Sequence, residues 1–165
     1  RSADGTFTQR YRTSAATTNW LVYRLSDIIL MKAEALVQLN RDVNDLRNAL
    51  QLVNTTYLRS NPTADSLSFT AYANQSDMEK LVLRERQREL MFEGKRWFDL
   101  MRLVLRKNDP TVILAYLSPK LSGDNMQLKK LSVIDGLYFP VLKSELDINP
   151  NLKQNPFYED ESFTN

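Results

Sequence analysis

Three glutamates spaced four residues apart, Glu85, Glu89 and Glu93, are the side chains of this sequence whose type and spacing could do chemistry. On a helix, that spacing places all three carboxylates on one face. Such a stripe could ligate a divalent cation, or it could supply the acid and the base for glycoside hydrolysis. A di-iron centre in a helical bundle would normally add histidine, and this sequence has none.

Arginines surround the carboxylate stripe at positions Arg84, Arg86, Arg88 and Arg96. Nearby cations neutralise carboxylates, which disfavours metal binding by the stripe. An arginine-rich helix could instead bind phosphates, but the interleaved glutamates would face the same anions, so we expect no nucleic-acid binding. The favoured interpretation is an intramolecular ion-pair network that locks this helix to its neighbours. The apolar residues around it indicate that some of the pairs are partly buried.

The composition narrows the possible chemistry further. The 165 residues contain neither histidine nor cysteine, and 22 Lys and Arg against 20 Asp and Glu leave a net charge of only +2. The missing residue types exclude Ser-His-Asp and Cys-His catalysis, disulfides and thiolate or imidazole metal sites. We therefore expect no enzyme activity, no metal and no cofactor.

Helices must position these charges, and the sequence predicts an all-α fold in one domain. Apolar residues at helical spacing predict a first helix from Trp20 to about Asn40 and a second over 45–58. Joined by a short break, the two would form an antiparallel hairpin of the tetratricopeptide-like kind over 20–58. We expect residues 1–19 to form an irregular lead-in and residues 59–75 to form a loop.

A pair of charged helices is expected over 76–107. Ser76 and Glu79 have the spacing of a capping box, so the third helix should begin there and run to about Phe92. Gly94 should end or kink it, and a fourth helix should occupy 95–107. The spacing of Trp97, Phe98 and Phe92 predicts that all three rings pack in the helical core.

The sequence beyond residue 110 loses its helical periodicity. Prolines and glycines punctuate short apolar pieces there. We expect 110–165 to be mostly coil, with extended segments that leave room for one small strand pair. The tail, with Glu159, Asp160 and Glu161, should be a solvated acidic end.

Three collinear motifs in this sequence resemble those of SusD/RagB-like proteins. The first runs from Arg24 to Leu36, the second from Glu85 to Arg102, and the third is the closing Asn-Pro-Asn-Leu-Lys-Gln-Asn-Pro segment at 149–156. The similarity spans about residues 20–158. The motif residues, which we expect to have structural roles, are Arg24, Asp27, Glu34, Glu85, Arg86, Arg88, Glu89, Glu93, Gly94, Arg96, Trp97, Asp99, Arg102, Asn149, Pro150, Asn151, Gln154 and Asn155.

This resemblance implies an all-α protein exposed at the surface of the outer membrane of a Bacteroidetes-type bacterium. Such proteins bind oligosaccharides, polysaccharides or other nutrients without catalysis and deliver them to a SusC-like TonB-dependent transporter. It also implies that the chain is the C-terminal portion of a longer lipoprotein. A signal peptide and a lipid-anchoring cysteine would then lie upstream of Arg1, and that anchor would be its contact with the membrane.

No motif assigns a ligand contact, so the ligand-binding residues remain unknown from the sequence. Aromatic residues at expected helix ends or loops are freer to face a sugar than the others, although packing is the commoner role. These are Tyr11, Trp20, Tyr23, Tyr57 and Tyr72. Two alternatives stay open: a tetratricopeptide-like module that binds a protein partner without sugar affinity, and a glycosidase that uses Glu85 or Glu89.

Overall fold

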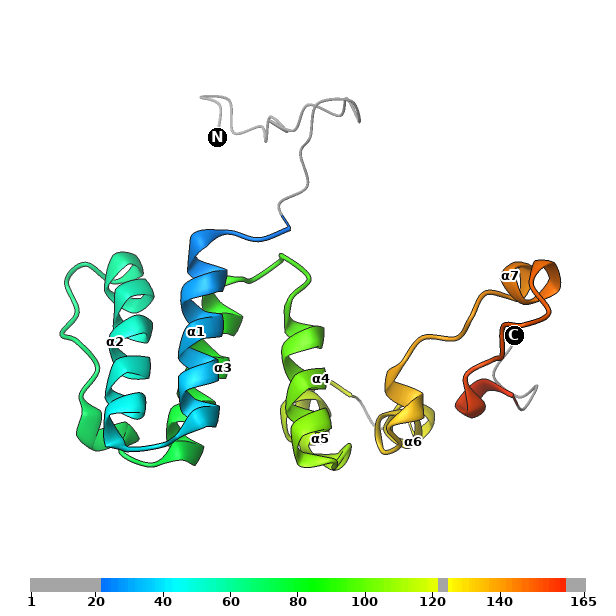
Figure 1. Cartoon of the computed structure of the whole chain (residues 1–165). Helices are drawn as coiled ribbons and strands as arrows, with labels where there is room; N and C mark the ends of the chain where they lie inside the picture. The colour runs from blue at the N-terminus through cyan, green and yellow to red at the C-terminus, as the bar shows by residue number, and fades with distance from the viewer. Residues whose placement is uncertain (1–21, 122–124, 160–165) are drawn as a thin grey trace, which may run out of the picture.

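The computed structural model describes residues 22–121 and 125–159, and all regular structure within these ranges is helical. Within these ranges, four longer helices are followed by three short ones (Figure 1). The longer helices are α1 (Leu25–Leu39), α2 (Val43–Ser60), α3 (Gln75–Glu89) and α4 (Arg96–Lys107). The short ones are α5 (Thr111–Leu117), α6 (Asn125–Leu131) and α7 (Lys143–Ile148). The predicted fold class is confirmed.

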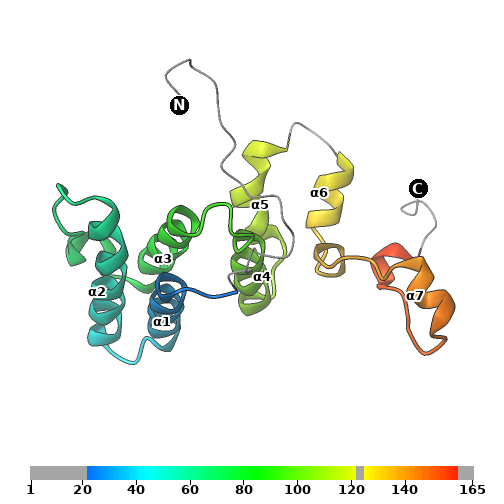
Figure 2. The ribbon, with the colours of Figure 1, turned by 90° about the horizontal axis from the view of Figure 1, so that it is seen from above.

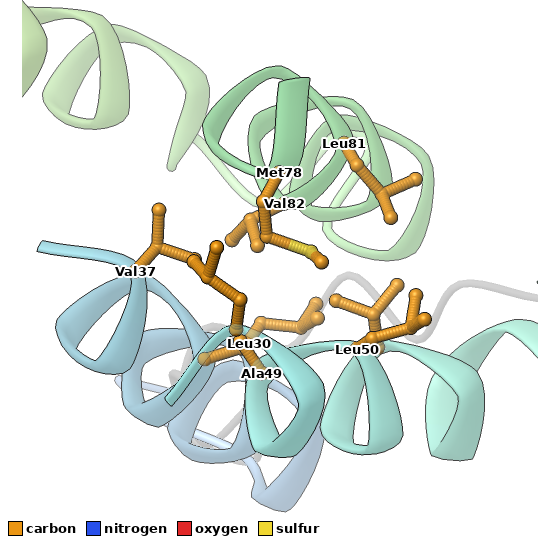
Figure 3. Packing of buried hydrophobic residues seen from close by; sticks show 10 residues of the cluster. Leu30, Val37, Ala49, Leu50, Met78, Leu81 and Val82 are labelled. Carbon is orange, nitrogen blue, oxygen red and sulfur yellow. The ribbon is translucent and has the colours of Figure 1, made fainter. Parts of the chain in front are cut away.

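The main core lies between α1, α2 and α3. Fully buried side chains at helical spacing on α1 (Leu30, Ala33, Val37) meet the apolar faces of α2 and α3. Figure 3 shows Leu30, Ala49 and Leu50 pointing toward Met78, Leu81 and Val82. Because each helix buries one stripe against the other two, burial of apolar surface stabilises all three together. The predicted hairpin is the α1–α2 part of this unit.

Polar caps set the helix ends, and one of them differs from the prediction. Asn74, not Ser76, caps α3, and its side chain accepts a hydrogen bond from the Asp77 backbone amide at 2.9 Å. Asn is as good a cap as Ser, so the helix begins one residue before Ser76 and places it in the first turn. Asp42 caps α2 in the same way, and α1 begins at Leu25 rather than near Trp20.

The turn between α3 and α4 is longer than predicted. The third helix ends at Glu89, and Phe92 and Gly94 both have positive φ values, 68° and 71°. A left-handed conformation at two positions reverses the chain, and only glycine adopts it without steric cost. The helix therefore stops before Phe92, whose ring is 96% exposed. The prediction that Phe92 packs in the core is wrong.

The C-terminal part is more helical than predicted. Helices α5, α6 and α7 and three short 3-10 turns occupy much of 111–158, where we expected mostly coil and room for a strand pair. Short helices of six or seven residues span too few turns to show a clear periodicity. A second apolar cluster holds α4, α5 and α6 together through Leu100, Val104, Ile113, Leu131 and Leu137.

The helices are arranged in a row. In Figures 1 and 2, α1, α2 and α3 form one group, α4 and α5 lie beside it, and α6 and α7 follow farther away. The two apolar clusters belong to neighbouring groups, so α4 stands where they meet. Among the described residues, no helix is both long and apolar enough to cross a bilayer.

Candidate functional site

A buried charge cluster joins α4 to α1 and α3. The Arg86 guanidinium, 2% exposed, lies 2.9 Å from one oxygen each of Asp27 and Asp99, whose side chains are equally enclosed. Arg86 also donates to the backbone carbonyl of Asp27. Taking charges out of water is costly, so the loss of one partner would leave an uncompensated buried charge. The cluster thus fixes three helices in one arrangement.

A second group of charges extends this cluster along α4. Arg102 donates to Glu34 at 2.8 Å and to Asp99 at 2.7 Å. One turn on, Arg106 reaches both Glu34 and Glu79. Spacings of three and four residues place Asp99, Arg102 and Arg106 on one face of α4. That face is turned toward α1 and α3 and carries these charges together with the buried Leu103.

The glutamate stripe does not act as one site. Arg24 donates to both carboxylate oxygens of Glu93 and to Glu89, and Arg59 also pairs with Glu89. Glu85 is 3% exposed, and its closest cation, Arg88, is 3.9 Å away. The stripe is therefore divided between two separate environments, one saturated by arginines and one nearly unpaired.

The pKa values follow these environments. Burial raises the pKa of Glu85 above its usual range, and the distant Arg88 compensates only in part. Burial also acts against ionisation of Glu89 and Glu34, but hydrogen bonds from Arg59 and Arg24, and from Arg102 and Arg106, hold their pKa values below the usual range. Glu89 and Glu34 are thus held as ions, whereas Glu85 is the one of the three whose surroundings favour the neutral acid.

Two further cations, Arg96 of the motif and its neighbour Lys95, differ in their partners. The guanidinium of Arg96 donates to the Leu83 carbonyl at 3.1 Å and lies 5.3 Å from the Tyr116 ring centroid, and burial lowers its pKa. Lys95 lies 3.3 Å from Asp27 and 4.5 Å from the Tyr23 ring centroid, where it makes a cation–π contact. Lys95 therefore links the buried cluster to an exposed aromatic ring.

The ion pairs that join Asp27, Glu34, Arg86, Asp99 and Arg102 form a charged seam between α4 and the pair α1 and α3. Two adjoining cavities open beside this charged seam. One, of about 490 Å³, has Asp27, Arg86 and Asp99 in its wall and Tyr23 and Phe98 at its edge. The other, of about 480 Å³, lies between α4 and the segment 137–139 and includes Trp97, Tyr138 and Phe139. Tyr23, Phe98 and Arg102 line both. The two hollows form one groove with a polar part and an aromatic part.

The aromatic residues are placed differently from the prediction. Phe98 is 61% exposed, so its expected core position is wrong, whereas Trp97 is half-buried against the second apolar cluster. Tyr57 and Tyr72 are half-buried, and Tyr23 is exposed. Tyr11 and Trp20 lie outside the described residues. Helical spacing alone did not reveal that α4 presents Phe98 outward, since only the placement of its neighbours decides which face is covered.

The closing motif holds the chain around the aromatic part of the groove. The Gln154 amide donates to and accepts from the Val141 backbone at 3.0 and 2.8 Å, and Asn155 donates to the Asp135 carbonyl. Asn149 accepts a hydrogen bond from the Asn151 backbone amide across Pro150. These amide side chains fasten the coil on either side of 137–139. No feature of the sequence pointed to Tyr138 and Phe139 as groove residues.

Comparison with known proteins places the geometry in a family context. The model of the SusD family matches residues 3–158. Two curated relatives from Formosa agariphila are similar: SusD-like protein P38, 38% identical over 89 residues, and SusD-like protein P2, 30% identical over 93 residues. The matches cover 52% and 54% of this chain but only 17% and 18% of those relatives. No solved structure matches.

Proposed function

Because the chain belongs to the SusD family, we propose that it takes part in binding glycans, or another nutrient, at a bacterial cell surface. The observation that carries the proposal is the family match over residues 3–158. SusD family proteins are non-catalytic binding proteins, so the glycosidase alternative falls away. The divided glutamate stripe agrees with that conclusion, because Glu89 is saturated by two arginines.

The proposed setting is the outer membrane. The bound nutrient would pass to a SusC-like TonB-dependent transporter, and a lipid anchor would hold the protein at the surface. The structure is compatible with a scaffold for capture: a helical frame fixed by buried ion pairs next to a groove with exposed aromatic rings. Sugar rings present flat C–H faces and rims of hydroxyls, which suit aromatic faces and charged or amide groups respectively.

A second candidate is a module that binds a protein partner through the α1–α2 hairpin. A shallow hollow of about 230 Å³ lies between these helices, lined by Lys32, Leu36 and Leu52 among others. This candidate predicts no affinity for sugars. Its motivation is the hairpin alone, so it ranks below glycan capture.

Affinity electrophoresis across plant, fungal and host polysaccharides tests the proposal. We expect the full-length native protein to be retarded by at least one polysaccharide. Running the 165-residue chain beside it would show whether this portion contributes to binding. Absence of retardation on every glycan would contradict glycan capture and favour a peptide nutrient or a protein partner, with the fold unchanged.

A further inference from the structure

We propose that the groove beside α4 binds pyranose rings of an uncharged glycan, with Tyr23 and Phe98 as stacking faces and the charged seam as its polar wall. The inference rests on the proposed glycan-binding function and deepens it by locating a site and a ligand class. Neither the family match nor the sequence motifs assign these residues to a ligand.

The aromatic rings that line the groove are largely exposed. Tyr23, Phe98 and Phe139 are 62%, 61% and 75% exposed, and Tyr138 is 46% exposed. All four line the two adjoining cavities. Large aromatic rings bury 150–250 Å² when covered, so leaving several uncovered on one surface forgoes much hydrophobic stabilisation. Such clusters mark interaction sites.

Buried carboxylate oxygens that accept no hydrogen bond lie in the wall behind the rings. Both carboxylate oxygens of Asp27 and Oδ2 of Asp99 accept no hydrogen bond among the described residues, although both side chains are about 1% exposed. Asp27 lies at ion-pair distance from Arg86 and Lys95, but the angles are not those of hydrogen bonds. Buried acceptors of this kind call for a partner.

The charges in the polar wall of the groove balance one another, and this balance selects the class of ligand. The cavity next to the seam is lined by three acids, Asp27, Glu93 and Asp99, and three bases, Arg86, Lys95 and Arg102. These groups pair with one another or with nearby side chains, so the wall has no net charge to offer an ionic ligand. Glu93, Lys95 and Arg102 keep part of their side chains exposed, 32%, 20% and 39%. They provide acceptors and donors for hydroxyls.

The size of the groove agrees with this assignment. Each cavity, about 490 and 480 Å³, falls within the range of roughly 300–1,000 Å³ typical of small-molecule sites. Because the cavities share Tyr23 and Phe98, a chain of linked sugars can occupy both. The polar part would hold one ring, and the part between α4 and 137–139 would hold the next.

The test compares single substitutions in the full-length native protein, with isothermal titration and affinity electrophoresis on neutral and acidic polysaccharides. We expect Phe98→Ala and Tyr23→Ala each to weaken binding of a neutral glycan about tenfold or more, since each removes one aromatic face.

Two variants serve as controls. Phe98→Tyr keeps the face and should retain binding. Phe92→Ala is the matched control, because Phe92 is 96% exposed on the neighbouring turn and lines neither cavity. Circular dichroism and thermal melts verify that each variant is folded.

Each outcome decides the proposal. Loss of affinity in Phe98→Ala and Tyr23→Ala, with Phe98→Tyr and Phe92→Ala unchanged, supports it. Neutral-glycan binding that survives both alanine substitutions, or binding confined to acidic glycans, overturns this site while glycan capture stands. A native protein that binds no glycan overturns both the site and the proposed function. Equal weakening by Phe92→Ala would show that the effect is not local to the groove and would also overturn the site.

Discussion

Two contacts of the helical frame differ in chemistry: the one that α4 makes with α1 and α3, and the one among α1, α2 and α3. The face of α4 toward α1 and α3 carries Asp99, Arg102 and Arg106 in ion pairs, whereas Phe98 and Leu105 on the neighbouring face are 61% and 50% exposed. By contrast, the contact between α1, α2 and α3 is made by buried aliphatic side chains. Buried charges require specific partners at specific positions, which aliphatic packing does not. The charged seam therefore fixes how the two helical groups meet, and the face of α4 that carries Phe98 is left available.

The largest expected effect comes from breaking the seam at its centre. Arg86→Ala removes the buried cation shared by Asp27 and Asp99 and leaves each carboxylate with one partly exposed cation, Lys95 or Arg102. We expect it to lower the free energy of unfolding by about 3–5 kcal/mol. Urea denaturation measures the loss. Lys80→Ala, on the same helix, is the control, because Lys80 and its partner Asp77 are 65% and 45% exposed and an exposed pair contributes only about 0–1 kcal/mol. Similar losses in both variants would contradict the importance of the buried partners.

Weakening the seam at α4 should have a smaller but clear effect. Asp99→Ala removes the acceptor shared by Arg86 and Arg102, and Arg96→Ala removes a half-buried cation that donates to the Leu83 carbonyl. We expect each to lower the Tm by at least a few degrees, since 1 kcal/mol corresponds to about 2–4 °C for a chain of this size. Calorimetry measures the shift. If either variant kept its Tm and lost ligand binding, the structural role of that residue would be wrong.

Removing the aromatic face should leave stability nearly unchanged. Phe98→Ala takes away a ring that is mostly exposed, and surface substitutions usually change the free energy of unfolding by less than about 0.5 kcal/mol. The urea midpoint of this variant should therefore equal that of the native protein within error. Leu100→Ala, on the buried face of the same helix, is a contrasting variant with an expected loss of about 2–5 kcal/mol. A large loss in Phe98→Ala would mean that the ring is structural.

The smallest expected effect is a gain. The raised pKa of Glu85 means that its contribution to stability is fully present below the ordinary glutamate pKa and is lost as pH rises through the higher folded-state value. Glu85→Gln removes that loss, so at pH 7 the variant should be more stable, by up to about 1 kcal/mol.

The pH dependence of that gain provides its control. The advantage of Glu85→Gln should shrink as pH falls below about 4.5, where the native glutamate is neutral in both states. The lowered pKa values of Glu34 and Glu89 act in the opposite direction: their contributions are present above the ordinary glutamate pKa and are lost as pH falls through the lower folded-state values. Denaturation curves from pH 3 to pH 8 measure both. A variant less stable than the native protein at pH 7 would contradict the assignment of Glu85 as a buried acid whose charge is only partly compensated.

The sequence predicted the longer helices because their apolar residues recur over several turns, as at Leu30, Ala33 and Val37. It also predicted that charges around Arg86 would be partly buried. It did not predict α5, α6 and α7, whose lengths of six or seven residues are too short for a periodicity to stand out. Phe98 was misplaced because helical spacing identifies faces but not which face a neighbouring helix covers. Tyr138 and Phe139 join the groove only through the long-range contacts of the closing segment.

Hydrogen–deuterium exchange of the native protein with and without a bound neutral glycan tests most directly whether the outer face of α4 is the ligand face. If the glycan occupies the groove, hydrogen exchange should slow in peptides that cover 22–24, the first turns of α4 and 137–139. Exchange in α2, which lies away from the groove, should not change. Slowing confined to α1 and α2, or to segments outside these ranges, would contradict it.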